Sequence, residues 1–102
     1  MENYLIYDNE KYLPLGSVVA LKGNVQKLLI VSRAVLVGED KVFFDYGACY
    51  YPEGMMGNSY VYFNKNQIKK VFFRGYSDEE EESMLEAIDE ARNKILNTEQ
   101  NG

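Results

Sequence analysis

Few residues in this chain suit chemistry on a substrate. Its 102 residues include no histidine, which removes the commonest general base, the usual Ser and Cys triads, and most zinc and copper sites. Cys49 is the single cysteine and has no nearby base, so we expect a small buried hydrophobe. No glycine-rich phosphate loop or dinucleotide fingerprint is present. The sequence therefore predicts a protein that is not an enzyme and binds no cofactor.

Two groups of carboxylates are the remaining candidates for chemistry. Asp45 and Glu53 form an acid–base pair in principle, but such residues on a strand and in a Pro-Glu-Gly turn more often serve turn geometry and solvent exposure. The acidic run from Asp78 to Glu82 is expected on a helix and not in a ligand loop. Calcium binding there is the weaker interpretation, so no metal site is predicted.

Aromatic residues are the more informative group. Nine Tyr and five Phe are more than one small core is expected to hide. Tyrosine combines a large contact area with a polar tip, which suits protein interfaces, and methionine is an adaptable apolar contact. Two interpretations are open: these residues cover the half-exposed face of a sheet, or they bind a protein partner. The residues predicted to bind a partner are Tyr46, Tyr50, Tyr51, Pro52, Glu53, Met55, Met56, Tyr60 and Tyr62.

Alternating apolar residues predict the strands that position this cluster. We expect five strands, at residues 17–22, 27–37, 42–51, 60–63 and 68–73, with a turn or one helical turn at 64–67. The continuous apolar run Leu28–Val31 predicts burial on both faces of its strand. Gly47 indicates a bulge or a close backbone approach. Residues 1–12 are expected to form an extended arm that joins the sheet edge.

One long helical pattern follows the strands, at about residues 78–97. Ser77 with Glu80 predicts a capping box, and four carboxylates in the first turns favour the positive end of the helix dipole. One face of the helix is expected to be acidic, with Glu79, Glu82, Glu86 and Glu90. The opposite, apolar face is formed by Met84, Leu85, Ile88, Ala91, Arg92, Ile95 and Leu96.

The predicted fold is therefore an α+β domain of residues 1–102. It contains a five-stranded antiparallel bent sheet or small barrel packed on one C-terminal helix. The strands lie between about residues 17 and 73, and residues 98–102 are expected to be a frayed tail.

The net charge of −5 is unevenly distributed. Residues 1–76 contain nine Lys/Arg and seven Asp/Glu, whereas residues 77–102 contain two and nine. The acidic helix is a solvated face that aids solubility, or it meets a basic partner. Phosphates would repel this helix, so we expect no nucleic acid. A signal peptide and an apolar span are absent and the chain has a single cysteine, so we expect a cytoplasmic protein with no membrane partner.

Three sets of residues resemble a known family. They are Leu13-Pro14-Leu15-Gly16-Ser17-Val18-Val19-x-Leu21-Lys22-Gly23, then Asp45-Tyr46 followed by Tyr51-Pro52-Glu53-Gly54, and Phe73-Arg74-Gly75-Tyr76 before an acidic helix. Across residues 11 to 85, they resemble the DUF4176-like family of small proteins encoded beside LXG toxins in type VIIb secretion loci of Gram-positive bacteria.

The resemblance implies a function. It implies a non-enzymatic cytoplasmic adaptor or chaperone that binds a cognate type VII-exported LXG-type toxin and supports its stability or targeting. No catalytic residues come with it. Two alternatives are an immunity protein, whose acidic helix would face a basic active-site cleft, and a generic peptide-binding small barrel.

Overall fold

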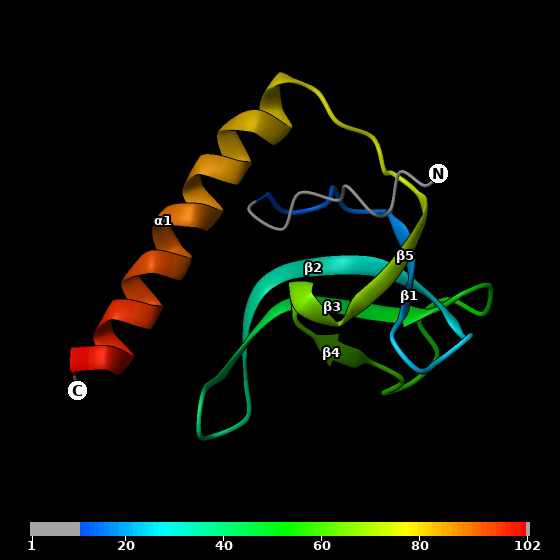
Figure 1. Ribbon diagram of the computed structural model, residues 1–102, viewed down its shortest axis with the longest axis horizontal. Helices are drawn as coiled ribbons and strands as arrows, with labels where there is room; N and C mark the ends of the chain where they lie inside the picture. Colours follow the sequence, from blue (N-terminus) through cyan, green and yellow to red (C-terminus); the bar gives the residue numbers. More distant parts are fainter. Residues whose placement is uncertain (1–10, 102) are drawn as a thin grey trace.

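The chain folds as one bent antiparallel sheet with one long helix beside it (Figure 1). The computed structural model describes residues 11–101, with the side chains described as far as residue 97. Most of the predicted N-terminal arm, residues 1–10, lies outside the described residues. The elements are β1 (Val18–Leu21), β2 (Lys27–Val37), β3 (Val42–Tyr50), β4 (Val61–Phe63), the 3₁₀ helix η2 (Lys65–Gln67), β5 (Ile68–Phe73) and α1 (Glu79–Asn101).

The sheet is open, in the strand order β4-β3-β2-β1-β5, and all its pairings are antiparallel. The predicted α+β class and the five antiparallel strands are confirmed, and the barrel alternative is not formed. The predicted ranges of β2 and β5 agree with the structure, and the single helical turn before β5 is present as η2. Figure 1 shows β2 and β3 curving together, which leaves β4 and β5 as separate edges.

The core lies on one face of this curved sheet. Its largest fully buried side chains come from β1, β2, β3, β4 and the segment before β1, and β5 contributes the buried Ile68. Ile88 is the one buried residue of α1 among those described. The prediction that β2 is buried on both faces was wrong, because Leu28 and Ile30 are buried whereas Leu29 and Val31 are only half-buried. The core cluster consists of Tyr12, Leu13, Val19, Leu28, Ile30, Tyr46, Ala48, Phe63, Ile68 and Ile88.

Gly47 permits the tight pairing at the centre of the sheet. The register of β2 on β3 shifts between Ile30 and Ser32, opposite Gly47. A Cβ atom at Gly47 would lie 2.3 Å from Ser32 Oγ and 3.3 Å from the Tyr62 ring. Both parts of the prediction, a bulge and a close approach, are therefore confirmed, with the extra residue on β2.

The helix begins one residue later than the predicted cap implies. Asp78 Oδ1 accepts a hydrogen bond from the Glu81 N–H at 3.1 Å, and Asp78 O accepts one from the Glu82 N–H at 3.2 Å. Asp78 is thus the N-cap, and the predicted Ser77–Glu80 capping box was wrong. A carboxylate in the position before Glu79 reaches the third helical N–H, which Ser77 does not. The helix continues to Asn101, past its predicted end at Asn97.

The face that α1 turns to the protein is more polar than predicted. Leu85, Ile88, Ile95 and Leu96 are buried or half-buried, but Met84 is 51% exposed. Glu81, one of the four acidic residues of the first turn, lies on this inner face. The helix is therefore held by charge pairs as well as by apolar contacts.

Candidate functional site

The nine residues predicted to bind a partner belong to the β3–β4 hairpin and its connection, but they do not share one surface. Tyr46 is 0% exposed and belongs to the core, so it is not available to a partner. The other tyrosines and both methionines are exposed, as are Pro52 and Glu53. We use "Tyr/Met surface" for the exposed set Tyr50, Tyr51, Met55, Met56, Tyr60 and Tyr62.

Two turns with glycine shape the connection that exposes the methionines. Gly54 has a φ of 82°, pairs with Tyr50 as an isolated bridge, and donates its N–H to Tyr50 O at 2.7 Å. Gly57 has a φ of 62°, another left-handed conformation that other residues adopt at a cost. Met55 and Met56 lie between these glycines and are 57% and 61% exposed. The backbone thus holds two flexible apolar side chains in solvent.

Part of the Tyr/Met surface lies on the outer face of the sheet, the face opposite the core. Tyr62 pairs with Gly47, whose neighbours Tyr46 and Ala48 point into the core, so the Tyr62 ring lies on the outer side. Tyr60 stacks on Tyr62, with ring centroids 5.6 Å apart and 14° between the planes. Because Gly47 has no side chain, the Tyr62 ring lies directly against the strand.

Lys27 extends the outer face toward β5. Lys27 pairs with Ala20 of β1, and its Nζ lies 5.8 Å from the Tyr51 ring centroid and 5.0 Å from the Phe72 ring centroid. Tyr51 is therefore on the outer face, whereas Tyr50 pairs with the core residue Leu28 and lies at the rim of the inner face. An ammonium between two aromatic rings joins the Tyr/Met surface to the edge strand.

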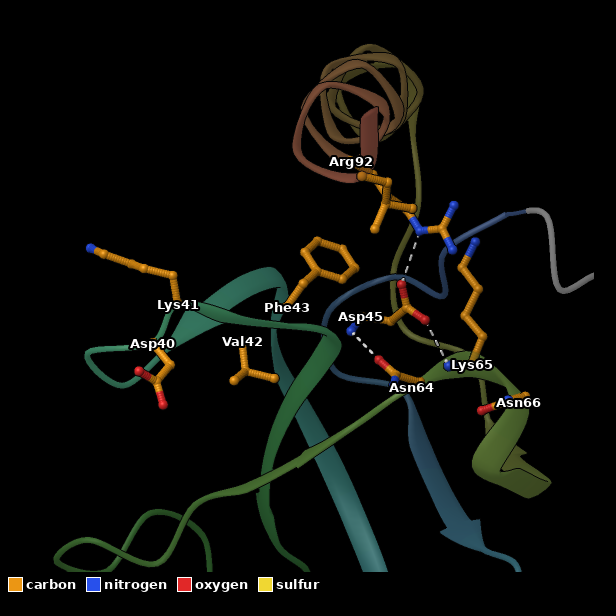
Figure 2. Close-up of a pocket in the computed structure, with 10 residues that line it drawn as sticks. Asp40, Lys41, Val42, Phe43, Asp45, Asn64, Lys65, Asn66 and Arg92 are labelled. Atoms are coloured by element: carbon orange, nitrogen blue, oxygen red, sulfur yellow. Dashed lines mark hydrogen bonds and ion pairs between the residues drawn. The ribbon is translucent and has the colours of Figure 1, made fainter. Parts of the chain in front are cut away.

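The middle of β3 carries a buried charged network around Asp45 (Figure 2). Asp45 Oδ1 accepts hydrogen bonds from the Tyr12 hydroxyl at 2.7 Å and from Arg92 Nε at 3.2 Å. Asp45 Oδ2 accepts the backbone N–H of Lys65 at 2.9 Å, and the Asp45 N–H donates to Asn64 Oδ1 at 2.9 Å. The carboxylate thus connects the N-terminal segment, η2 and α1.

An open groove of about 620 Å³ lies beside this network, between the β2–β3 turn, η2 and the second half of α1. Figure 2 shows Phe43 of β3 next to Arg92 of α1, and the Arg92 guanidinium carbon lies 6.0 Å from the Phe43 ring centroid. The groove mixes both charges with apolar side chains, because it is lined by Asp40, Lys41, Val42, Phe43, Asp45, Asn64, Lys65, Asn66, Arg92 and Leu96.

A second charge pair joins α1 to the sheet. The Arg33 guanidinium forms a two-pronged contact with the Glu81 carboxylate, in which Arg33 Nη2 and Glu81 Oε1 are 3.0 Å apart. Arg33 Nη1 also donates to Leu13 O at 3.1 Å. The two side chains are 5% and 11% exposed, so this pair is shielded from solvent. A planar guanidinium suits such a pair because its geometry matches the carboxylate.

The geometry of these charged groups indicates that they stabilise the fold. Burial, and then the hydrogen bond to the Asp45 carboxylate, raise the pKa of the Tyr12 hydroxyl far above its usual value, so this hydroxyl stays a donor. Glu53 lies in the exposed turn past Tyr50, the last residue of β3, and Tyr50 is itself five residues from Asp45, on the order of 15 Å along a strand. Asp45 and Glu53 therefore do not form the acid–base pair considered from the sequence.

Other potential chemistry is limited within the described residues. Cys49 is buried, as predicted. No group of three or more His, Cys, Asp or Glu residues in the described part of the chain is arranged to hold a metal ion. No helix among residues 11–101 is both long and apolar enough to cross a membrane.

Sequence reasoning missed the charge pairs. Arg92 was placed on the apolar face of the helix, and Arg33 interrupts the apolar sequence of β2. A charged residue inside an apolar pattern was the available signal, since such residues are buried only when paired. The sequence did not indicate which carboxylate each arginine would meet.

The chain matches the model of a known protein family. A family described as a domain of unknown function, DUF4176, matches residues 12–84. This match covers most of the chain, from Tyr12 of the Asp45 network to the first turns of α1, and the protein belongs to this family. The comparisons with curated proteins and with solved structures found no match.

Proposed function

We propose that this protein is a non-enzymatic cytoplasmic adaptor or chaperone that binds a cognate LXG-type toxin exported by a type VII system. The observation that carries the binding role is the Tyr/Met surface, which exposes four tyrosines and two methionines around one connection. Aromatic residues and methionine are enriched at protein interfaces, and buried aromatic anchors contribute most of the binding free energy there. The toxin as partner comes from the family resemblance described above.

The proposal places the toxin on the Tyr/Met surface and not on the acidic face of α1. Exposed ion pairs contribute under about 1 kcal/mol each and weaken with salt, whereas an aromatic anchor contributes about 2 kcal/mol or more. A complex that must persist until export at cellular ionic strength therefore needs the aromatic contacts. The acidic face, with Glu82, Glu86 and Glu90 exposed, is expected to affect the association rate more than the affinity.

The test is a binding titration of the toxin, divided into its helical N-terminal half and its toxic C-terminal half. The double variant Tyr51→Ala/Met55→Ser should weaken binding of the N-terminal half by about tenfold or more. The matched control is Tyr76→Ala/Met84→Ser, which removes the same residue types where they are also exposed, beside the start of α1. Equal losses from the two double variants would contradict the proposed surface.

Immunity is the alternative function, and the exposed acidic face of α1 is the observation in its favour. Charge complementarity with a basic catalytic cleft would then dominate binding. In that case Glu82→Lys/Glu86→Lys should weaken binding of the C-terminal half more than Tyr51→Ala/Met55→Ser does. Rescue of poisoned cells by this protein, with no change in toxin export or abundance, would replace the adaptor proposal.

A further inference from the structure

The edge strand β5 has the features of a second binding site, one that accepts backbone. β5 is the last strand of the open sheet and, among the described residues, pairs with β1 alone (Figure 1). The N–H and C=O groups on its other side have no strand partner in the described part of the chain. Such an edge is a template on which an extended segment of another protein is able to add a strand.

The edge strand β5 is protected only in part: it carries the exposed Lys69 and Lys70 and its pairing with β1 shifts register twice, but it also exposes two phenylalanines. Proteins usually protect edges with charged residues, proline, bulges or very short strands. β5 has six residues, and its consecutive Phe72 and Phe73 are 41% and 61% exposed. An added strand would place its side chains about 4.5–5.5 Å from theirs. Two exposed phenylalanines favour association with an apolar segment.

Among the described residues, the charged side chains of β5 and of the adjacent β1 and start of β2 are all cationic. Residues 11–38 and residues 54–77 contain no Asp or Glu. Apart from Lys11, the exposed cations in these stretches lie on or next to β5, β1 and the start of β2; they are Lys22, Lys27, Lys69, Lys70 and Arg74. A second copy of this chain paired through β5 would bring Lys69 and Lys70 close to like charges, which is unfavourable. An acidic segment would meet complementary charge instead.

The β5 edge is also continuous with the Tyr/Met surface. Phe72 lies between two ammonium groups, with Lys27 Nζ 5.0 Å and Lys70 Nζ 4.8 Å from its ring centroid. Lys27 also lies over Tyr51. A partner that covers Tyr51 therefore has a direct path across Lys27 to Phe72 and the free edge.

We propose that β5 binds an extended acidic segment of a protein partner, with apolar residues alternating with Asp or Glu, as a sixth strand of the sheet. Backbone hydrogen bonds to β5 supply affinity, and Lys69, Lys70 and Phe72 select an acidic, apolar segment over others. This site rests on the proposed function only for the identity of the partner as the toxin.

The direct test uses a synthetic acidic peptide and the full-length protein. The peptide alternates glutamate with valine over about eight residues, within the length range of natural strands. Amide hydrogen exchange read by NMR should show added protection at alternate amides of β5 and no added protection in the central strand β2. A peptide with lysine in place of glutamate, and one with alternate amides N-methylated, should each bind at least about tenfold more weakly.

Matched variants separate specific pairing from general charge attraction. Lys69→Glu/Lys70→Glu should weaken binding of the acidic peptide by about tenfold or more, and Phe72→Ser should weaken it further. Lys41→Glu/Lys94→Glu changes the net charge equally at exposed positions on the β2–β3 turn and α1, and should change affinity by less than about threefold.

The proposal is overturned if the peptide protects no β5 amide, or if the two double variants weaken binding equally. It is also overturned if β5 becomes protected with rising protein concentration alone, because a second copy then occupies the edge. The proposed function fails separately. Toxin bound at the Tyr/Met surface without β5 protection would overturn only the β5 site, whereas peptide bound at β5 with neither toxin half bound would overturn only the toxin role.

Discussion

The middle and the C-terminal end of β3 carry the same residue type with opposite outcomes. Tyr46 and Tyr50 lie four residues apart and face the same side of the strand. Tyr46 is fully buried, packs between Tyr12 and Phe63, and accepts the Leu13 N–H at 2.8 Å. Tyr50 is 37% exposed at the rim. The two tyrosines differ in exposure because of what covers them. The N-terminal segment packs over Tyr46, whereas only a loop borders Tyr50.

The same contrast separates the charged residues. At the covered end, Asp45 and Glu81 are shielded and each is paired with an arginine. Away from it, Glu82, Glu86 and Glu90 are exposed, and the cations near β5 face solvent. A paired, shielded charge holds elements together, whereas an exposed one is available to a partner. The covered end of the sheet thus stabilises the fold, and the open end is the place for binding.

The largest expected effect comes from exchanging tyrosine for alanine in the middle of β3 and just past its end. Tyr46→Ala should lower the free energy of unfolding by about 3–5 kcal/mol, because it leaves a cavity among Tyr12, Leu13 and Phe63. Tyr51→Ala should change it by no more than about 0.5 kcal/mol, since Tyr51 is exposed. Urea unfolding followed by circular dichroism measures both.

Tyr46→Phe sharpens this comparison. It keeps the ring but leaves the buried Leu13 N–H without its acceptor, so we expect a loss of about 1–3 kcal/mol. A Tyr46→Ala protein as stable as Tyr51→Ala would mean that the N-terminal segment does not cover this end of the sheet.

The next effect concerns two neighbouring glutamates of α1. Glu81→Ala should cost about 3 kcal/mol, because it leaves the shielded Arg33 guanidinium without its carboxylate. Glu82→Ala, one residue along the same helix and exposed, should change stability by at most about 0.5 kcal/mol. Chemical denaturation measures the difference, and equal values would show that the Arg33–Glu81 pair does not hold α1 to the sheet.

The dependence of stability on alkaline pH tests whether the Tyr12 hydroxyl is buried. The pKa of its hydroxyl is raised by burial and by Asp45, so above about pH 10 the unfolded chain releases this proton whereas the folded chain keeps it. The stability that Tyr12 contributes is therefore fully present below pH 10 and is lost as the pH rises further. Relative to Tyr12→Phe, the wild-type advantage should be constant near neutral pH and should decrease by about 1.4 kcal/mol per pH unit above about 10. An advantage that is independent of pH would show that Tyr12 is exposed to solvent.

The sequence predicted local elements better than long-range contacts. The ranges of β2 and β5 and the helical turn at η2 follow from alternation and turn residues within a few positions of each other. Asp45, in contrast, meets Tyr12 and Arg92 across 33 and 47 residues. No spacing rule links residues so far apart, so the buried network was not predicted.

The candidate surface shows the same limit. Alternation places Tyr46 and Tyr50 on one side of β3, but it does not say which of them another segment covers. Tyr46 was therefore assigned to the partner surface although it belongs to the core. Phe72 and Lys27 were missed because they join Tyr51 only when β1, β2 and β5 lie side by side.

The smallest expected effect decides which residue begins α1. Asp78→Ala should cost about 1 kcal/mol, because Asp78 Oδ1 accepts the Glu81 N–H and its charge lies at the positive end of the helix dipole. Ser77→Ala should cost no more than a few tenths of a kcal/mol, since Asp78 occupies the cap. Asp78→Asn keeps the cap hydrogen bond without the charge, so its loss should be intermediate and should diminish with salt. Thermal unfolding of the three variants at two salt concentrations gives the order. A larger loss from Ser77→Ala than from Asp78→Ala would move the cap back to Ser77 and lengthen the helix by one residue.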